Sequence, residues 1–171
     1  MPEVTAYIGV GSNIDPQHHV PVALRALRTT FGTLDRSPAY RSPPLGFEGA
    51  DFINCVVRIT GCLDVTALIA KLKALESSAG RQTRATSRSR ELDLDLLLYG
   101  DGIIHRDGIA LPRPDVLEYA FVLRPLAELA PAFPHPVTGR SLAWHWEHFA
   151  GAALALTPVT LSGAESVMGK G

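Results

Sequence analysis

Blocks of hydrophobic and polar positions alternate along this chain, and the period of each block predicts its secondary structure. The segment 4–10 is β-branched and aromatic and stops at Gly-Ser-Asn, so it predicts a strand, and 52–61 predicts another. In 92–99 leucines recur at every second position through Leu98, which is the period of a strand with one buried face. The stretch 33–42 predicts a weaker strand.

Two further segments predict helices. The first covers 16–31 and starts at Asp15-Pro16, where the aspartate is a candidate N-cap and the proline suits the first helical position. The second covers 65–79 and follows Asp64, another candidate N-cap, and its apolar residues recur with the helical period. A glycine follows each segment directly, and glycine commonly ends helices.

The order strand, helix, strand, strand, helix, strand predicts the fold class. It is the split βαβ pattern of a ferredoxin-like α+β fold, a mainly antiparallel sheet with both helices on one face. Additions follow toward the C-terminus, where 120–131 predicts a short helix interrupted at Pro125. We expect one domain over 1–150 and a peripheral tail rich in Ala, Gly and Ser over 151–171.

Composition narrows the class of protein. Of the 171 residues 46% are hydrophobic, which indicates a globular chain, and a net charge of -1 gives no overall field for nucleic acid or a membrane surface. Cys55 and Cys62 fit no zinc spacing, and no apolar stretch reaches the roughly 20 residues of a membrane span. With only two cysteines, we expect a protein of the reducing cytoplasm.

An acid pair is the first candidate for chemistry. Asp93 and Asp95 are two residues apart on a predicted strand, so they share a face at about 6.5–7 Å, while Leu92, Leu94, Leu96 and Leu98 face the other way. Two carboxylates at this separation suit one or two Mg²⁺ ions together with substrate phosphates. The alternatives are two solvated acids, or an acid pair neutralised by arginines.

A third carboxylate, Glu76, lies within the apolar stripe of the second predicted helix. A charge in such a stripe lowers stability unless it has a partner. Either Glu76 lies where the stripe meets the rim of the sheet, or its carboxylate points into a site that the helix helps to enclose.

Arginines crowd the segment 81–91, which we interpret as a mobile loop. Arginine forks match phosphate oxygens, so a loop that leads into the acid pair could cover a metal-bound phosphate chain. The alternatives are a solvated basic loop and a contact with nucleic acid. The evidence for nucleic acid is weak, because no aromatic residues lie between the arginines. The stretch 9–14 lacks the third glycine of a dinucleotide fingerprint and predicts a tight turn at a strand end.

Taken in order, five segments resemble the 6-hydroxymethyl-7,8-dihydropterin pyrophosphokinases of folate synthesis. They are AYIGVGSNI, SPAYRSPPLGFEGADFINCVV, LESSAGR, RELDLDLLLYG and FVLRPLAELAP, which together run from residue 6 to residue 131. The resemblance implies a ferredoxin-like fold, ATP and two Mg²⁺, and transfer of pyrophosphate from ATP to the hydroxymethyl group of a pterin, with AMP as the other product. Two alternatives stay open: a paralogue acting on another pterin, or a catalytically weak protein that binds a pterin or nucleotide.

The resemblance also assigns candidate residues. Candidates for the pterin are Ser42, Pro43, Leu45, Asn54 and the two sandwiching rings Phe52 and Phe121. Candidates for ATP are Glu76, Arg81, Arg84, Arg88, Arg90, Leu96 and Arg113. Candidates for catalysis are Arg81, Arg90, Asp93 and Asp95, of which the two aspartates would hold the metal.

The sequence departs from the family pattern on the ATP side. SRSR stands where the family usually has Trp-Gly-Pro-Arg, and Arg113, between two prolines, stands where the family has histidine. Tyr119 occupies the place of an arginine. Because a guanidinium is charged at any working pH, we expect Arg113 to replace the histidine as a phosphate contact.

Overall fold

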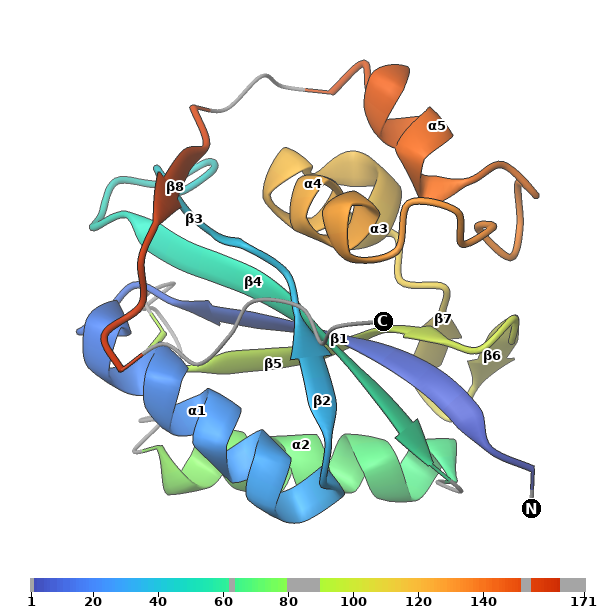
Figure 1. Ribbon diagram of the computed structural model, residues 1–171, viewed down its shortest axis with the longest axis horizontal. Coiled ribbons are helices and arrows are strands. Elements are labelled where there is room, and N and C mark those ends of the chain that lie inside the picture. The colour runs from blue at the N-terminus through green and yellow to red at the C-terminus, as the bar shows by residue number, and fades with distance from the viewer. Residues whose placement is uncertain (1, 62–63, 80–89, 152–154, 164–171) are drawn as a thin grey trace.

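The structure is a computed structural model that describes residues 2–61, 64–79, 90–151 and 155–163. A six-stranded sheet lies between two layers of helices (Figure 1). All strand pairs are antiparallel, which confirms the predicted α+β class. None of the helices in these ranges is long and apolar enough to cross a membrane.

The sheet has the strand order β5-β1-β4-β3-β8, and β2 also pairs with β4. Its strands are β1 (Val4–Ser12), β2 (Leu34–Arg36), β3 (Ala39–Ser42), β4 (Phe52–Gly61), β5 (Asp93–Tyr99) and β8 (Thr157–Val159). The weak strand predicted over 33–42 is therefore two short strands, β2 and β3. A separate hairpin consists of β6 (Ile104–Arg106) and β7 (Ile109–Leu111).

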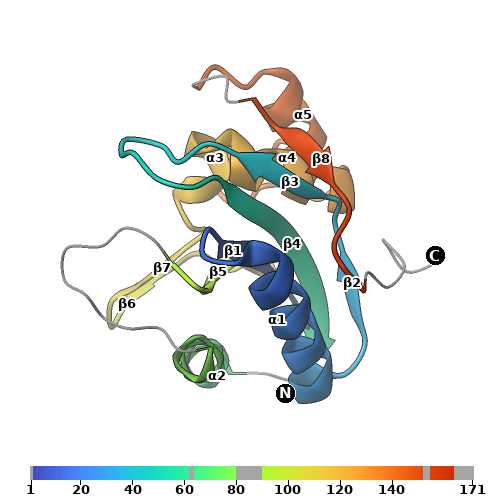
Figure 2. The same cartoon turned by 90° about the vertical axis from the view of Figure 1, so that its left-hand side faces the viewer.

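The helices divide between the two faces of the sheet (Figures 1 and 2). The first face carries α1 (Pro16–Phe31) and α2 (Val65–Ser78), as predicted. The C-terminal additions cover the second face with α3 (Asp115–Glu118), α4 (Ala120–Leu129) and α5 (Leu142–Glu147). The sheet is therefore buried on both sides, and any site on it must lie where these layers leave a gap.

The two predicted N-caps behave differently. The Asp64 carboxylate accepts a hydrogen bond from the Ala67 backbone N–H at 3.1 Å, which is the expected cap of α2. Asp15 precedes α1 but makes no side-chain cap, because its own backbone is left-handed with a φ of 45°. The side-chain capping predicted for Asp15 is thus wrong, and Pro16 alone marks the first turn.

Pro125 does not interrupt α4, contrary to the prediction. It lies inside the continuous helix and is buried. A proline in this position removes its own hydrogen bond to the preceding turn and crowds the carbonyl four residues earlier, and packing of the apolar residues around it compensates. Pro21 has the same place inside α1.

Each face of the sheet has its own hydrophobic core. The core on the α1 and α2 side includes the fully buried Ile8, Leu27 and Leu68. The core on the α4 and α5 side includes the fully buried Leu98 and Leu126. The sequence pattern assigns Leu98 to the same face as the leucines before it, and this is wrong. The register between β1 and β5 shifts after Tyr7, so a bulge turns Leu98 to the other face.

Part of the predicted peripheral tail belongs to the sheet. Residues of β8 pair with β3, and Leu161 is buried in the core on the α1 side. The Ser162 backbone N–H donates to the Gln17 side chain at 3.0 Å. The domain boundary at residue 150 stays a prediction.

A polar contact fixes β3 to α4, the two elements that lead into the site. The Tyr40 hydroxyl donates to Glu128 Oε1 at 2.5 Å, and the Arg124 guanidinium lies 4.6 Å from the centre of the Tyr40 ring. Burial, together with the neighbouring Glu128 carboxylate, raises the pKa of Tyr40 to about 12. The phenol therefore stays neutral and remains a donor at physiological pH.

Candidate active site

The floor of the site is a row of residues across three adjacent strands. Gly11 of β1 pairs with Asn54 of β4 on one side and with Asp93 of β5 on the other. Gly9, two residues earlier, pairs with Asp95 in the same way. The central strand thus carries no side chain between the Asn54 amide and the two carboxylates, which leaves a hollow over β1.

The interpretation of 9–14 as a tight turn is wrong for 9–12, since β1 continues through Ser12, and the chain bends only from Asn13 on. Glycine predicts a turn by its backbone freedom, but here its small size matters. A Cβ on Gly11 would lie 2.5 Å from Asn54 Oδ1, well inside van der Waals contact. Glycine therefore lets the Asn54 amide lie directly over β1.

A cavity of about 330 Å³ opens above this floor. All candidate pterin residues line it, from β3 and the loop after it, from β4 and from α4: Ser42, Pro43, Leu45, Phe52, Asn54 and Phe121. Its aromatic rings lie in two pairs. Phe52 meets Phe47 edge to face at 6.2 Å between centroids, and Phe121 stacks on Tyr119 at 5.2 Å. We call this the aromatic cavity.

A second cavity, of about 450 Å³, lies on the other side of β5. Of the candidate ATP residues, Glu76, Arg90, Leu96 and Arg113 line it. Three others, Arg81, Arg84 and Arg88, lie outside the described residues, as does Gly80, the predicted end of the second helix. The wall also includes Lys73 and the turn and strand of the β6–β7 hairpin, which the sequence analysis missed. We call this the polar cavity.

The two cavities meet at the acid pair. Asp93, Asp95 and Arg113 line both of them. Arg90 Nε lies 3.9 Å from Asp93 Oδ1, and Arg113 Nη2 lies 3.7 Å from Asp95 Oδ1. Each carboxylate thus has an arginine beside it, which agrees with the alternative of an acid pair neutralised by arginines. Both carboxylates nevertheless remain partly exposed to the two cavities.

Glu76 combines both interpretations that its sequence position left open. Its carboxylate is buried and accepts a hydrogen bond from the Leu94 backbone N–H at 2.7 Å. Since β5 lies at the edge of the sheet that the described residues form, this N–H has no partner from another of those strands on its outer side. Glu76 therefore fixes the rim of the sheet and also contributes to the wall of the polar cavity.

Asn13 is a positioning residue that the sequence analysis missed. Its Oδ1 accepts from the Arg90 backbone N–H at 2.7 Å, and its Nδ2 donates to the Ala50 carbonyl at 3.3 Å. One buried amide thereby joins the start of the acid strand to the loop beside the aromatic cavity. The only sequence signal was its place directly after a strand, where amide side chains often bind backbone groups.

Within the described ranges, no group of three or more His, Cys, Asp or Glu side chains converges on a metal position. Two carboxylates from β5 are available at the junction of the cavities. This donor set fits Mg²⁺ that takes its remaining ligands from phosphate oxygens and water, and it does not fit a closed structural site.

The structure thus has an aromatic cavity and a polar cavity that meet at two carboxylates, and active sites for group transfer are commonly arranged in this way. Residues 7–131 match the family described as 7,8-dihydro-6-hydroxymethylpterin-pyrophosphokinase (HPPK). The chain belongs to this family, which confirms the resemblance and the enzyme class that it implies, a pterin pyrophosphokinase of folate biosynthesis.

The matching relatives include proteins of similar length and much longer ones. The 2-amino-4-hydroxy-6-hydroxymethyldihydropteridine pyrophosphokinase of Haemophilus influenzae is 36% identical over 131 residues, 74% of this chain and 82% of that protein. Folic acid synthesis protein fol1 of Pneumocystis carinii is 33% identical over 146 residues, 82% of this chain but only 20% of that protein.

Solved structures agree on the fold. The Plasmodium falciparum HPPK-DHPS wild type with STZ-DHP superposes with a TM-score of 0.71 at 11% identity, over 86% of this chain and 43% of that chain. The chain thus spans less than half of this protein and about a fifth of fol1. This likeness confirms the predicted fold.

Proposed function

We propose that the chain transfers the pyrophosphate of ATP to the hydroxymethyl oxygen of 6-hydroxymethyl-7,8-dihydropterin, with Mg²⁺ as the metal. The hydroxyl oxygen attacks the β-phosphorus and its proton passes to solvent water, the bond from that phosphorus to the α,β-bridging oxygen breaks, and AMP leaves with those electrons. One observation carries the proposal: Asp93, Asp95 and Arg113 line both cavities, so ligands in the two would meet at the acid pair.

In this mechanism the aromatic cavity binds the pterin. A flat heterocycle suits stacking between Phe52 and Phe121, with the Asn54 amide fixing its orientation in the plane. The loop residues Ser42 and Leu45 close the side of the cavity. Holding the hydroxymethyl group toward β5 supplies the proximity on which such transfers depend.

The polar cavity would bind the triphosphate. Arg90 and Arg113 carry positive charge beside the acid pair and neutralise phosphate oxygens, as arginine forks do. Asp93 and Asp95 would hold Mg²⁺, which when bound offsets phosphate charge and aligns the two substrates. Arg81, Arg84 and Arg88 are proposed to contact ATP as well.

The setting proposed for this reaction is a monomer in the cytoplasm that binds no nucleic acid. Cys55 is a free, buried thiol, and burial raises its pKa to about 12, so it stays protonated and unreactive. A free thiol is ordinary in a reducing compartment. Size-exclusion chromatography with light scattering tests the oligomeric state directly.

Release of AMP tests the proposed reaction. The protein is incubated with ATP, Mg²⁺ and 6-hydroxymethyl-7,8-dihydropterin, and AMP and the pterin diphosphate are quantified together. We expect equal amounts of both products, and neither when the pterin or the metal is omitted. Turnover only with another pterin would favour the paralogue, and binding without any AMP would favour a binding protein.

Removing the Asn54 amide is expected to weaken pterin binding selectively. A neutral hydrogen bond to a heterocycle contributes about 0.5–1.5 kcal/mol, so Asn54→Ala should lower pterin affinity about 2- to 10-fold. Gly11→Ala should have a similar effect at nearly unchanged stability, because its methyl group displaces only the end of the Asn54 side chain. Thr60→Ala, exposed farther along β4, is the control.

Calorimetric titrations of pterin and of a non-cleavable ATP analogue measure the two affinities separately. Pterin affinity should fall in both variants while nucleotide affinity stays within about twofold. Equal losses for both ligands, or no loss in Gly11→Ala, would contradict a role for the amide in orienting the pterin.

A further inference from the structure

Arg113 occupies an anchored position at the junction of the two cavities. Its backbone N–H donates to the Leu97 carbonyl of β5 at 2.9 Å, and its own carbonyl accepts from the Val116 N–H at 3.1 Å. The root of the side chain is therefore fixed next to the acid strand. Any movement of the guanidinium must come from side-chain rotation, since the backbone is held on both sides.

Two carboxylates hold the guanidinium at different distances. Nε lies 3.1 Å from Asp115 Oδ2, whereas Nη2 lies 3.7 Å from Asp95 Oδ1. Burial tends to lower the pKa of Arg113, but the charges of Asp95 and Asp115, with Asp93 beyond them, raise it overall. The contact with Asp95 is long and partly exposed to water, so it is the weaker of the two and the easier to break.

We infer that Arg113 is an exchangeable counter-ion of the acid pair, one that leaves Asp95 when a divalent cation binds and then faces the nucleotide phosphates. This rests on the proposed function. A metal ion and a guanidinium beside the same carboxylate repel each other, so binding one disfavours the other. Asp115 retains Arg113 during the exchange, and the polar cavity that Arg113 also lines receives its charge.

The exchange predicts effects of opposite sign for one substitution. Arg113→Gln removes the competing charge, so Mn²⁺ should bind the nucleotide-free protein about two- to fivefold more tightly. The same variant should bind the nucleotide with metal present at least about fivefold more weakly, because a charged phosphate contact is lost. A residue that merely supports the fold would weaken both, and a simple phosphate contact would change only the second.

The experiment titrates the intact protein with Mn²⁺ alone by calorimetry, and then with α,β-methylene ATP in excess Mg²⁺. The parent, Arg113→Gln and Arg25→Gln are compared, the last being an exposed α1 charge outside both cavities. Tighter Mn²⁺ binding together with weaker nucleotide binding, in Arg113→Gln alone, supports the exchange.

Three results would overturn it: Mn²⁺ affinity that is unchanged or lower in Arg113→Gln, nucleotide affinity that is unchanged, or the same changes in Arg25→Gln. Failure of the proposed function would look different. In that case the parent protein itself would release no AMP with ATP, Mg²⁺ and the pterin, whatever its metal affinity.

Discussion

Asparagine in place of Asp95 is expected to remove nearly all turnover and to leave the fold intact. The substitution keeps the shape of the side chain and deletes one of the two charges proposed to hold Mg²⁺. Charge stabilisation by the metal is worth several kcal/mol, so a loss of about 3–4 kcal/mol lowers kcat/KM roughly 100- to 1000-fold. Initial rates of AMP release at saturating pterin and varied ATP concentration measure kcat/KM for ATP.

Stability should hardly change in this variant. Asp95 is about 40% exposed and its contact with Arg113 is long, and such surface pairs contribute about 0–1 kcal/mol. Removing one of two neighbouring negative charges also relieves repulsion in the metal-free protein. Melting temperatures with and without Mg²⁺ should therefore show the loss of metal stabilisation and little else.

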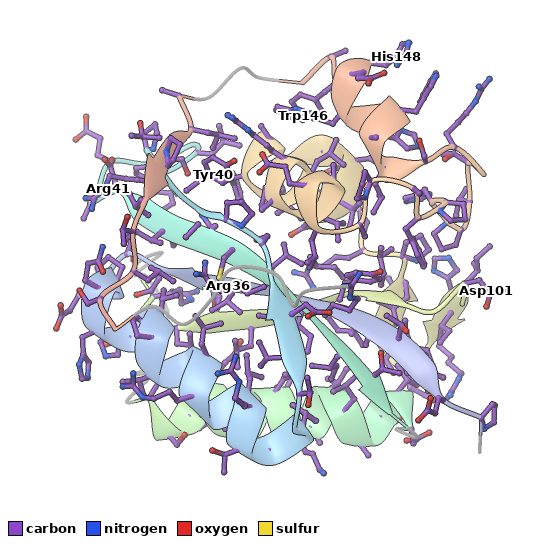
Figure 3. The ribbon with its side chains drawn as sticks, viewed as in Figure 1. Arg36, Tyr40, Arg41, Asp101, Trp146 and His148 are labelled. Carbon is purple, nitrogen blue, oxygen red and sulfur yellow. The ribbon has the colours of Figure 1, made fainter. Side chains whose placement is uncertain are left out.

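Asp101→Asn is the matched control. Asp101 is exposed in the turn after the same strand. In Figure 3 it lies at the opposite side of the molecule from Arg41, which is next to the cavity-lining residue Ser42 in β3. It should keep parental activity and metal response. Near-parental turnover in Asp95→Asn, or equal losses in both variants, would rule out Asp95 as a metal ligand.

The sequence predicts the acid pair because its signal is local. Alternation along β5 is enough to place Asp93 and Asp95 on one face, away from the buried Leu94. The same alternation fails at Leu98, since a bulge depends on how β5 pairs with β1 and not on the residues of β5 itself. Local periodicity therefore predicts the face of a side chain only where the pairing of β5 with β1 has no register shift.

Other features of the site depend on strands that are distant in sequence. Gly9 and Gly11 predict a turn by residue type, and only the pairing of β1 with β4 and β5 shows that they form a floor. The contact of Arg113 with Asp95, and the lining of the polar cavity by Lys73, need tertiary packing in the same way. The family resemblance supplies the pterin residues, because one sequence carries no local signal for a ring-binding cavity.

Phe121 is the aromatic residue whose removal should affect pterin binding most. It is partly exposed at the start of α4, and Tyr119 stacks on one of its faces with an interplanar angle of 10°. A bound heterocycle can therefore use only the other face. Tyr119 in turn limits tilting of the Phe121 ring, which keeps that face in position for a ligand in the aromatic cavity.

Phe121→Ala is accordingly expected to weaken pterin binding about 5- to 150-fold, since stacking of one heterocycle on one aromatic side chain contributes about 1–3 kcal/mol. Titration of pterin into protein saturated with α,β-methylene ATP and Mg²⁺ measures the effect, and affinity for the nucleotide alone should stay within about twofold. Phe149→Ala controls for general loss of packing, because it removes a ring that is also partly buried but lies outside both cavities. If Phe149→Ala weakens pterin binding as much, or if Phe121→Ala weakens nucleotide binding equally, Phe121 does not stack on the pterin.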